Sequence, residues 1–142
     1  MSNICLISKW KLKNGVSNGL LKDIEDLVEK VQESEKNTLM YRVNFKARTP
    51  LDSYDNVLES NPGDIPHDEL TEVIFLEIYE DAQAFSDHVQ GEVFNDFRKK
   101  TLEHFQPDPM KEGWPLTDTE FLSFQHGFVR DALWKEELIE YV

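Results

Sequence analysis

Hydrophobic and polar residues alternate over residues 4–13, where every second side chain from Ile4 to Leu12 falls on one better-buried face. A period of two is typical of a β-strand with one face in the core. After Ser17, a residue type that caps helices, apolar residues recur with a helical period over residues 20–31. The chain is therefore expected to open with a strand followed by an amphipathic helix.

Two further strands, a helical region and a fourth strand follow from the same periods. Residues 39–46 alternate again, whereas residues 73–79 are almost continuously apolar, which is typical of a strand buried on both faces. Asp81 can cap a helix, and the helical spacing continues past a bend at Gly91. Apolar residues alternate once more over residues 121–129, which predicts the last strand.

The order strand, helix, strand, strand, helix, strand predicts an α+β fold. It is the ferredoxin-like split βαβ arrangement, in which a four-stranded antiparallel sheet carries its helices on one face. The second face then needs cover, and we expect it to be apolar. Its expected members are Cys5, Ile7, Tyr41, Val43, Phe75 and Phe121. A second copy of the sheet is the simplest cover, so the pattern predicts a homodimer through the sheet faces.

We expect residues 1–142 to form a single domain with two additions. Residues 48–70 contain six acids against Arg48 alone and show little periodicity. A connection of this length usually has a function or is disordered, so we expect an acidic loop insert, exposed and mobile at a rim. Residues 131–142 repeat large apolar side chains at helical spacing, which predicts a helical tail.

The net charge of −13 narrows the classes of partner. Lys and Arg supply most of the affinity for phosphate groups, so this charge disfavours nucleic acid and anionic membranes. No apolar run reaches the roughly 18 residues that indicate a membrane span. The single cysteine, Cys5, allows no internal disulfide, which suits a reducing compartment, and a cytoplasmic location is expected.

The sequence contains none of the common motifs for nucleotide binding, zinc binding or serine hydrolysis. Its histidines, at positions 67, 88, 104 and 126, form no pair at metal-ligand spacing. The insert also lacks the order of acids that calcium-binding loops use. No metal site is therefore expected.

Residues 75–88 read Phe-Leu-Glu-Ile-Tyr-Glu-Asp-Ala-Gln-Ala-Phe-Ser-Asp-His, and residues 93–97 read Val-Phe-Asn-Asp-Phe. This stretch resembles the signature of the antibiotic biosynthesis monooxygenase (ABM) family. In that signature a Glu-x-Trp-x-Asp strand end precedes a helix with Ala and His, a short bend and a Phe-rich helix. Residues 10–15, Trp-Lys-Leu-Lys-Asn-Gly, resemble the family's first strand. The resemblance covers most of residues 3–105 and also the last strand.

The resemblance implies ferredoxin-like protomers that pair sheet to sheet into a dimeric α/β barrel, with a pocket between helices and sheet. Family members include cofactor-independent oxygenases of phenols and quinols, haem-degrading enzymes and proteins without an assigned activity. In the cofactor-free chemistry the deprotonated substrate itself supplies electrons to O₂. The protein then needs only to bind the phenol, accept its proton and exclude water, so no cofactor is expected.

Two departures from the family pattern limit what the resemblance implies. Oxygenases of aromatic polyketides use an Asn, a Trp and a Tyr where this chain has Phe75, Tyr79 and Phe85. Haem-degrading members carry their haem-ligating His at the position of Arg98. Without that imidazole, haem degradation is not expected.

His88 is the leading candidate for a catalytic base, because it matches the family His and because histidine changes protonation near neutral pH. Tyr79 is the second catalytic candidate, as a hydrogen-bond donor to a substrate oxygen. Each has an alternative interpretation. His88 can be a core histidine bonded to the backbone or a residue at the dimer rim, and Tyr79 can simply anchor its hydroxyl at the strand end.

Further residues are expected to bind substrate. They are Ser8, Trp10, Phe75, Phe85, Phe97, Arg98 and His126. The aromatic members would line an apolar slot, and the polar members would contact substrate oxygens or an anionic group. Core packing is the alternative for the aromatic residues, and an exposed ion pair is the alternative for Arg98.

The favoured function is therefore a cofactor-independent monooxygenase that acts on a hydroxylated aromatic or quinol. The alternative is a non-catalytic small-molecule-binding or dimerisation protein of the same fold, because a fold alone does not establish an activity. A small aromatic molecule is the ligand expected of a catalyst or a binder.

Overall fold

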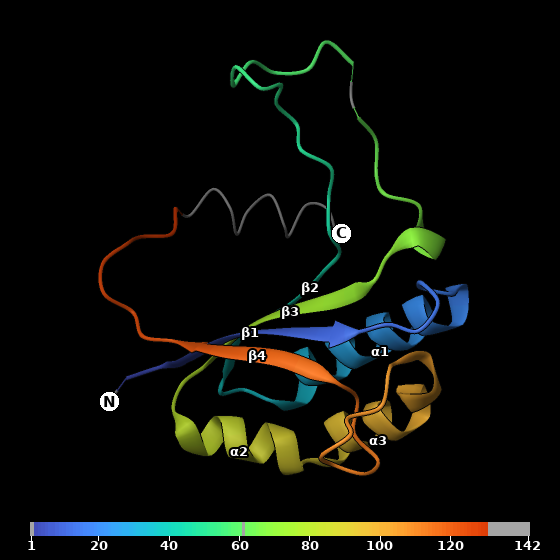
Figure 1. Cartoon of the computed structure of the whole chain (residues 1–142). Coiled ribbons are helices and arrows are strands. Elements are labelled where there is room, and N and C mark those ends of the chain that lie inside the picture. The colour runs from blue at the N-terminus through green and yellow to red at the C-terminus, as the bar shows by residue number, and fades with distance from the viewer. Residues whose placement is uncertain (1, 61, 131–142) are drawn as a thin grey trace.

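The computed structural model describes residues 2–60 and 62–130 (Figure 1). The predicted helical tail over residues 131–142 lies outside the described residues. The main elements are β1 (Ile4–Lys11), α1 (Asn18–Ser34), β2 (Thr38–Asn44), β3 (Glu72–Tyr79), α2 (Ala82–Gln90), α3 (Glu92–Thr101) and β4 (Thr117–Leu122). Short 3-10 turns, His67–Glu69 and Leu102–His104, precede β3 and follow α3.

The strands form one antiparallel sheet in the order β2-β3-β1-β4. The helices α1, α2 and α3 lie together on one face of this sheet (Figure 1). The order and the layering confirm the predicted α+β, ferredoxin-like class. Within the described ranges, no helix is long and apolar enough to cross a membrane.

The helices begin and end where local chemistry places their boundaries. The Ser17 hydroxyl accepts a hydrogen bond from the Leu20 amide at 3.1 Å, and the Asp81 carboxylate accepts one from the Ala84 amide at 2.8 Å. Gly91 ends α2, and a Cβ at this position would lie 2.8 Å from a backbone oxygen of α2. The glycine therefore lets α3 start immediately after α2.

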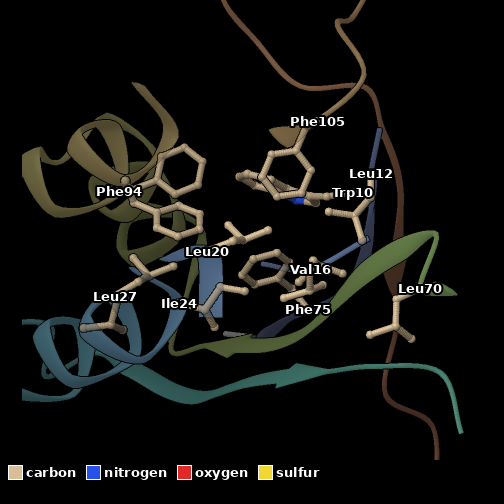
Figure 2. Close-up of a cluster of buried hydrophobic side chains, with 13 residues drawn as sticks. Trp10, Leu12, Val16, Leu20, Ile24, Leu27, Leu70, Phe75, Phe94 and Phe105 are labelled. Carbon is tan, nitrogen blue, oxygen red and sulfur yellow. The ribbon is translucent and has the colours of Figure 1, made fainter. Parts of the chain in front are cut away.

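The hydrophobic core lies between the helices and the sheet and is centred on Trp10 (Figure 2). Its indole packs against Phe75 and Phe105, with ring centroids at 4.9 and 5.3 Å, and against Phe94 and Phe97 at 6.0 Å each. Aliphatic side chains from α1 complete this cluster: Leu20, Ile24, Leu27 and Val31. Aromatic and aliphatic side chains thus fill the layer where the family pocket is expected.

The sheet register shows that part of the predicted second face is wrong. Tyr41, Val43, Phe75 and Phe121 all lie on the helix face of the sheet. Phe75 is directly opposite both Ser8 and Val43, and side chains opposite one another share a face. The error arose because β3 is apolar on both faces, so its sequence does not distinguish them. A register shift between Thr38 and Met40 also alters the alternation of β2.

The face of the sheet turned away from the helices, here called the open face, is nevertheless apolar. Cys5 and Ile7 lie on it as predicted, and the register adds Ile74, Leu76 and Ile78. All five side chains have intermediate exposure. The helices leave this face uncovered (Figure 1).

The predicted fourth strand over residues 121–129 is wrong in its position, because β4 spans Thr117–Leu122. Leu122 pairs with Cys5, and β1 begins only one residue earlier, at Ile4. Beyond Leu122, β4 therefore has almost no neighbouring strand with which to pair. Its first residues are polar and exposed, so hydrophobic alternation did not reveal them.

The insert leaves the sheet on the side away from the helices (Figure 1), and all six of its acids are exposed. The expectation that all of it lies outside the core is wrong for its C-terminal end. Leu70 is buried in the core and Ile65 packs against it. A backbone hydrogen bond holds this end of the insert against the core: the Val16 amide donates to the His67 carbonyl at 2.9 Å. We call this contact the backbone anchor.

Gly15 lies at this anchor with φ +68°, and an added Cβ would lie 2.6 Å from the His67 carbonyl oxygen. Gly63 has a similar φ of +74°, but a Cβ there would meet no heavy atom within 4 Å. We expect Gly63→Ala to lower the free energy of unfolding only by the roughly 1–2 kcal/mol that a left-handed backbone costs. Gly15→Ala should lower it clearly more. Denaturant unfolding of both variants measures the difference, and equal losses would contradict the close approach.

Candidate functional site

The candidate site is a group of titratable side chains between the sheet, α2 and the C-terminal end of α1. We call it the buried polar cluster, and its members are Glu35, Tyr41, Glu77, Tyr79 and His88. Glu77 and Tyr79 alternate onto the helix face of β3, while His88 is buried in α2. The cluster is therefore built from β2, β3, α2 and the residue that follows α1, which meet only in the folded chain.

His88 is 3% exposed, and its Nδ1 lies 2.7 Å from Oε1 of Glu35. The same oxygen accepts a hydrogen bond from the Thr38 hydroxyl at 3.0 Å, which holds the carboxylate in place. An ionised Glu35 keeps the imidazole proton on Nδ1, so Nε2 is the nitrogen that can accept a proton. Glu35 thus orients His88 as the acidic residue of a catalytic dyad or triad orients its histidine.

The His88 ring is enclosed by aromatic rings. The centroids of Phe94, Tyr41 and Tyr79 lie 5.1, 5.2 and 5.4 Å from it. Within the described part of the chain, its Nε2 is buried and has no hydrogen-bond partner. A buried polar atom without a hydrogen-bond partner typically lowers stability by about 1–3 kcal/mol, which makes Nε2 a candidate functional atom.

Glu77 is a second buried carboxyl group, 6% exposed, on the same face of the sheet. The Tyr79 hydroxyl donates a hydrogen bond to it at 2.5 Å, and Tyr41 lies directly opposite it in the β2–β3 register. Burial raises the pKa of Glu77 above its usual range, against the opposing effects of the Tyr79 hydrogen bond and of nearby His88. A neutral Glu77 is therefore favoured more in the folded protein than in the unfolded chain.

Both tyrosines of the cluster also have raised pKa values. Removal from water is the largest cause for each, and the charge of Glu77 comes next. Tyr41 keeps intermediate exposure as a residue, but its ring lies against His88 and Phe75. Tyr79 is fully buried.

These shifts predict a loss of stability in alkali. A pKa raised by folding stabilises the folded state below the unfolded value, which is about 10 for tyrosine, and this contribution is lost as the pH rises further. We expect the phenolate absorbance of Tyr41 and Tyr79 to appear together with unfolding, in an alkaline titration followed by absorbance and circular dichroism. Tyr41→Phe should remove part of that coincident step, and full ionisation of a folded protein would contradict the prediction.

A cleft of about 330 Å³ opens beside His88. Its lining residues are Ser34, Glu35, Lys36, Asn37, Thr38, Ala84, Asp87, His88, Gly91, Glu92 and Val93. The lining carries three acids against one lysine, so an anion is disfavoured there. A second cleft, of about 290 Å³, lies between α1 and α3, and no member of the buried polar cluster lines it.

Of the residues predicted from the sequence, the structure brings His88 and Tyr79 together. Phe85 is their neighbour, with its ring centroid 5.1 Å from that of Tyr79. Ser8 and Trp10 are instead bound to each other, because the indole Nε1 donates to the Ser8 hydroxyl at 3.1 Å. That hydroxyl also lies 2.7 Å from the hydroxyl of Thr119, so its hydrogen bonds are made within the protein.

The other predicted substrate-binding residues lie apart from the cleft beside His88. Phe75 and Phe97 are core residues. Arg98 donates hydrogen bonds to Asn95 and to the Gly113 carbonyl, and its guanidinium lies 4.3 Å from the Trp114 ring centroid. His126 is exposed beyond the end of β4. Arg98 thus anchors the loop before β4, and among the residues that the structure describes it forms no ion pair with an acid.

Sequence reasoning did not find Glu35, Tyr41 and Glu77. Glu77 could have been recognised as a candidate from the sequence. It is the one charged residue inside the apolar run of β3, and it matches the Glu of the family pattern. Glu35 follows α1 among other charged residues, and nothing in the sequence distinguishes it from them. In the described ranges, no three metal-binding side chains come together in a way that could hold a metal ion.

No protein-family model matches this chain, and no curated protein does. Solved structures do match. One is a protein of Caulobacter crescentus provisionally named an antibiotic biosynthesis monooxygenase, with a TM-score of 0.59 and 16% identity, covering 88% of this chain and 92% of that one. Another, named an antibiotic biosynthesis monooxygenase, has a TM-score of 0.56 and 18% identity over 87% of this chain and 99% of that one. The chain has an ABM-like fold.

The ABM-like fold is shared with a further protein, from Bacteroides fragilis, which is described as dimeric, of unknown function and ferredoxin-like. It has a TM-score of 0.55 and 10% identity, and the match covers 87% of this chain and 98% of that one. At these identities the likeness establishes the fold. A shared fold does not by itself establish a shared activity.

Proposed function

We propose that the protein is a cofactor-independent monooxygenase that acts on a hydroxylated aromatic or quinol, with His88 as its general base. The observation that carries the proposal is the state of the His88 ring. Glu35 holds Nδ1 at 2.7 Å, Nε2 has no partner in the described chain, and a cleft opens beside the ring. These are the features expected of a positioned base.

The reaction balances without a reductant when the substrate supplies all the electrons. For a phenol or naphthol whose para ring carbon carries a hydrogen, His88 removes the hydroxyl proton, and that ring carbon of the resulting anion forms a C–O bond to O₂ as its electrons reduce the oxygen. The imidazolium returns the proton to the peroxide. Loss of the proton on that ring carbon then breaks the O–O bond, leaving a carbonyl on the substrate and releasing water.

The cleft narrows the substrate class. Its volume of about 330 Å³ is near the lower end of ligand sites, which suits one or two fused rings better than an extended polycycle. The acids at its lining, Glu35, Asp87 and Glu92, disfavour a carboxylated ring. We therefore propose an uncharged phenol or quinol of this size.

A non-catalytic binding protein of the same fold is the second candidate, and one observation favours it. The layer between helices and sheet is filled by Trp10, Phe94, Phe105 and their neighbours, and His88 itself is buried. For catalysis, substrate binding has to open the floor of the cleft and expose Nε2. For a binder, no such opening is needed.

Oxygen uptake separates the two candidates. Purified protein is supplied with a panel of anthrones, naphthols and quinols that differ in ring number and in the presence of a carboxylate. The proposal predicts protein-dependent uptake with the smaller uncharged members. Saturable binding of these compounds, measured by calorimetry, without oxygen uptake would favour the non-catalytic candidate.

We also propose that residues 1–142 act as one domain and pair into a homodimer through the open face. The apolar side chains of that face, such as Ile7 and Leu76, support this, as does the dimeric relative of the same fold. Sedimentation at micromolar protein is expected to give the dimer mass. A monomer mass at every concentration would overturn the dimer without affecting the argument for His88.

A further inference from the structure

The first half of the insert contains an ordered turn, here called the insert tip (residues 51–57). Leu51 and Val57 form a β-bridge across it, and the Asp52 carboxylate accepts hydrogen bonds from the amides of Tyr54 and Asn56 at 2.8 and 3.0 Å. The tip nevertheless exposes apolar side chains, with Tyr54 at 84% and Val57 at 79%. A turn that fixes its backbone while presenting uncovered apolar groups is suited to contact another surface.

A second exposed apolar stretch follows β4, and we call it the terminal segment (residues 121–130). Phe124 and Phe128 are each 77% exposed, and Val129 is 62% exposed. Phe121 and Leu122 are also exposed. Large apolar side chains are seldom exposed this densely on protein surfaces, and such stretches typically mark interaction sites.

The insert tip and the terminal segment are complementary in character. Both leave the sheet on the side away from the helices (Figure 1). The tip carries two acids and no base, whereas the terminal segment carries Arg130 and no acid. Each offers apolar side chains that its own chain leaves exposed, so they do not cover each other within one copy.

We propose that the insert tip of one copy packs on the terminal segment of a second copy. The inference rests on the proposed homodimer, because two sheets facing each other would direct the tip of each copy toward the other molecule. Tyr54 and Val57 then cover Phe124 and Phe128, and the acids of the tip face Arg130. The contact explains why an acidic insert carries an ordered apolar tip.

Disulfide cross-linking tests the contact directly. All variants carry Cys5→Ser, and one population with Tyr54→Cys is mixed with another with Phe124→Cys under mild oxidation. The proposal predicts a covalent dimer that contains one chain of each kind. Met110→Cys, which places the thiol at a residue 91% exposed in the loop before β4, is the matched control for Phe124→Cys.

Two results would overturn the contact. One is a yield with Phe124→Cys no higher than with Met110→Cys. The other is closure of the disulfide within one chain when Tyr54→Cys and Phe124→Cys are combined, which would assign the contact to a single copy. Wild-type sedimentation is run in parallel, so failure of the dimer is distinguished from failure of this contact.

The energetic coupling provides a second measurement. Tyr54→Ser and Phe124→Ser are each expected to raise the dimer dissociation constant about tenfold, as loss of a central aromatic contact does. The doubly substituted protein should be weakened by less than the product of the two factors, because both remove the same contact. Independent effects would contradict direct packing, and oxygen uptake per folded chain is expected to stay unchanged.

Discussion

Replacing His88 by alanine is expected to lower turnover of a hydroxylated aromatic by about 10²–10⁴-fold, which is the usual contribution of a positioned general base. The variant loses the only imidazole of the cluster, while the hydrogen bond from Thr38 to Glu35 remains. Substrate affinity should change less than turnover, because the walls of the cleft still supply the contacts with the ring. Steady-state oxygen uptake, with kcat and KM determined separately, measures this.

Two controls separate chemistry from folding in the His88 experiment. His88→Gln keeps a side chain that can hydrogen-bond to Glu35 but cannot act as a base, so it should fold and remain slow. His104→Ala changes a histidine beside Glu103, outside the buried polar cluster, and should leave turnover intact. A folded His88→Ala protein with wild-type turnover would remove His88 from the mechanism.

Replacing Trp10 by alanine is expected to lower the free energy of unfolding by about 3–5 kcal/mol, the typical cost of truncating a large buried aromatic side chain. Trp10 contacts four phenylalanine rings, and its indole also donates a hydrogen bond to Ser8. The lost stability therefore has three sources: less buried apolar surface, a cavity in the core, and the loss of one hydrogen bond to the buried Ser8 hydroxyl. Denaturant unfolding measures the difference.

Trp10→Phe and Met110→Ala are the matched controls for this experiment. Trp10→Phe keeps most of the aromatic packing and should lose less than Trp10→Ala. Met110 is almost fully exposed, so its replacement should change stability by less than about 0.5 kcal/mol. A loss of similar size for Trp10→Ala and Met110→Ala would mean that the core is not centred on Trp10.

The fold was predictable because its elements carry local signals that agree with one another. The helical period of α1, the capping residues Ser17 and Asp81 and the alternation of β1 are all readable without tertiary contacts. Which residues lie on which face of the sheet could not be predicted in the same way. β3 is apolar on both sides, and only its register with Ser8 and Val43 shows where Phe75 points.

The position of β4 was missed for a different physical reason. The apolar alternation continues through residues 121–129, but a strand also needs a neighbour, and β1 begins at Ile4, opposite the end of β4. The residues that do pair with β1 start at Thr117 and are mostly polar. Pattern alone placed the strand on its apolar, unpaired continuation.

The candidate site was predictable only in part, because it is assembled by contacts distant in sequence. His88 and Tyr79 were identified from a local signature, yet Glu35, which orients His88, lies 53 residues away. The aromatic residues predicted to line a slot, such as Trp10 and Phe97, form core instead. Phenylalanine and tryptophan give the same sequence pattern in a core and in a ligand site.

Oxygen-isotope labelling is the most direct test of the proposed monooxygenase. Wild-type protein is supplied with ¹⁸O₂ and a small uncharged naphthol, and the products are analysed by mass spectrometry at early times. We expect one labelled oxygen atom in the organic product and one in water, at a rate that falls in His88→Ala. Product oxygen derived from solvent water, or a labelling rate equal with and without the protein, would contradict it.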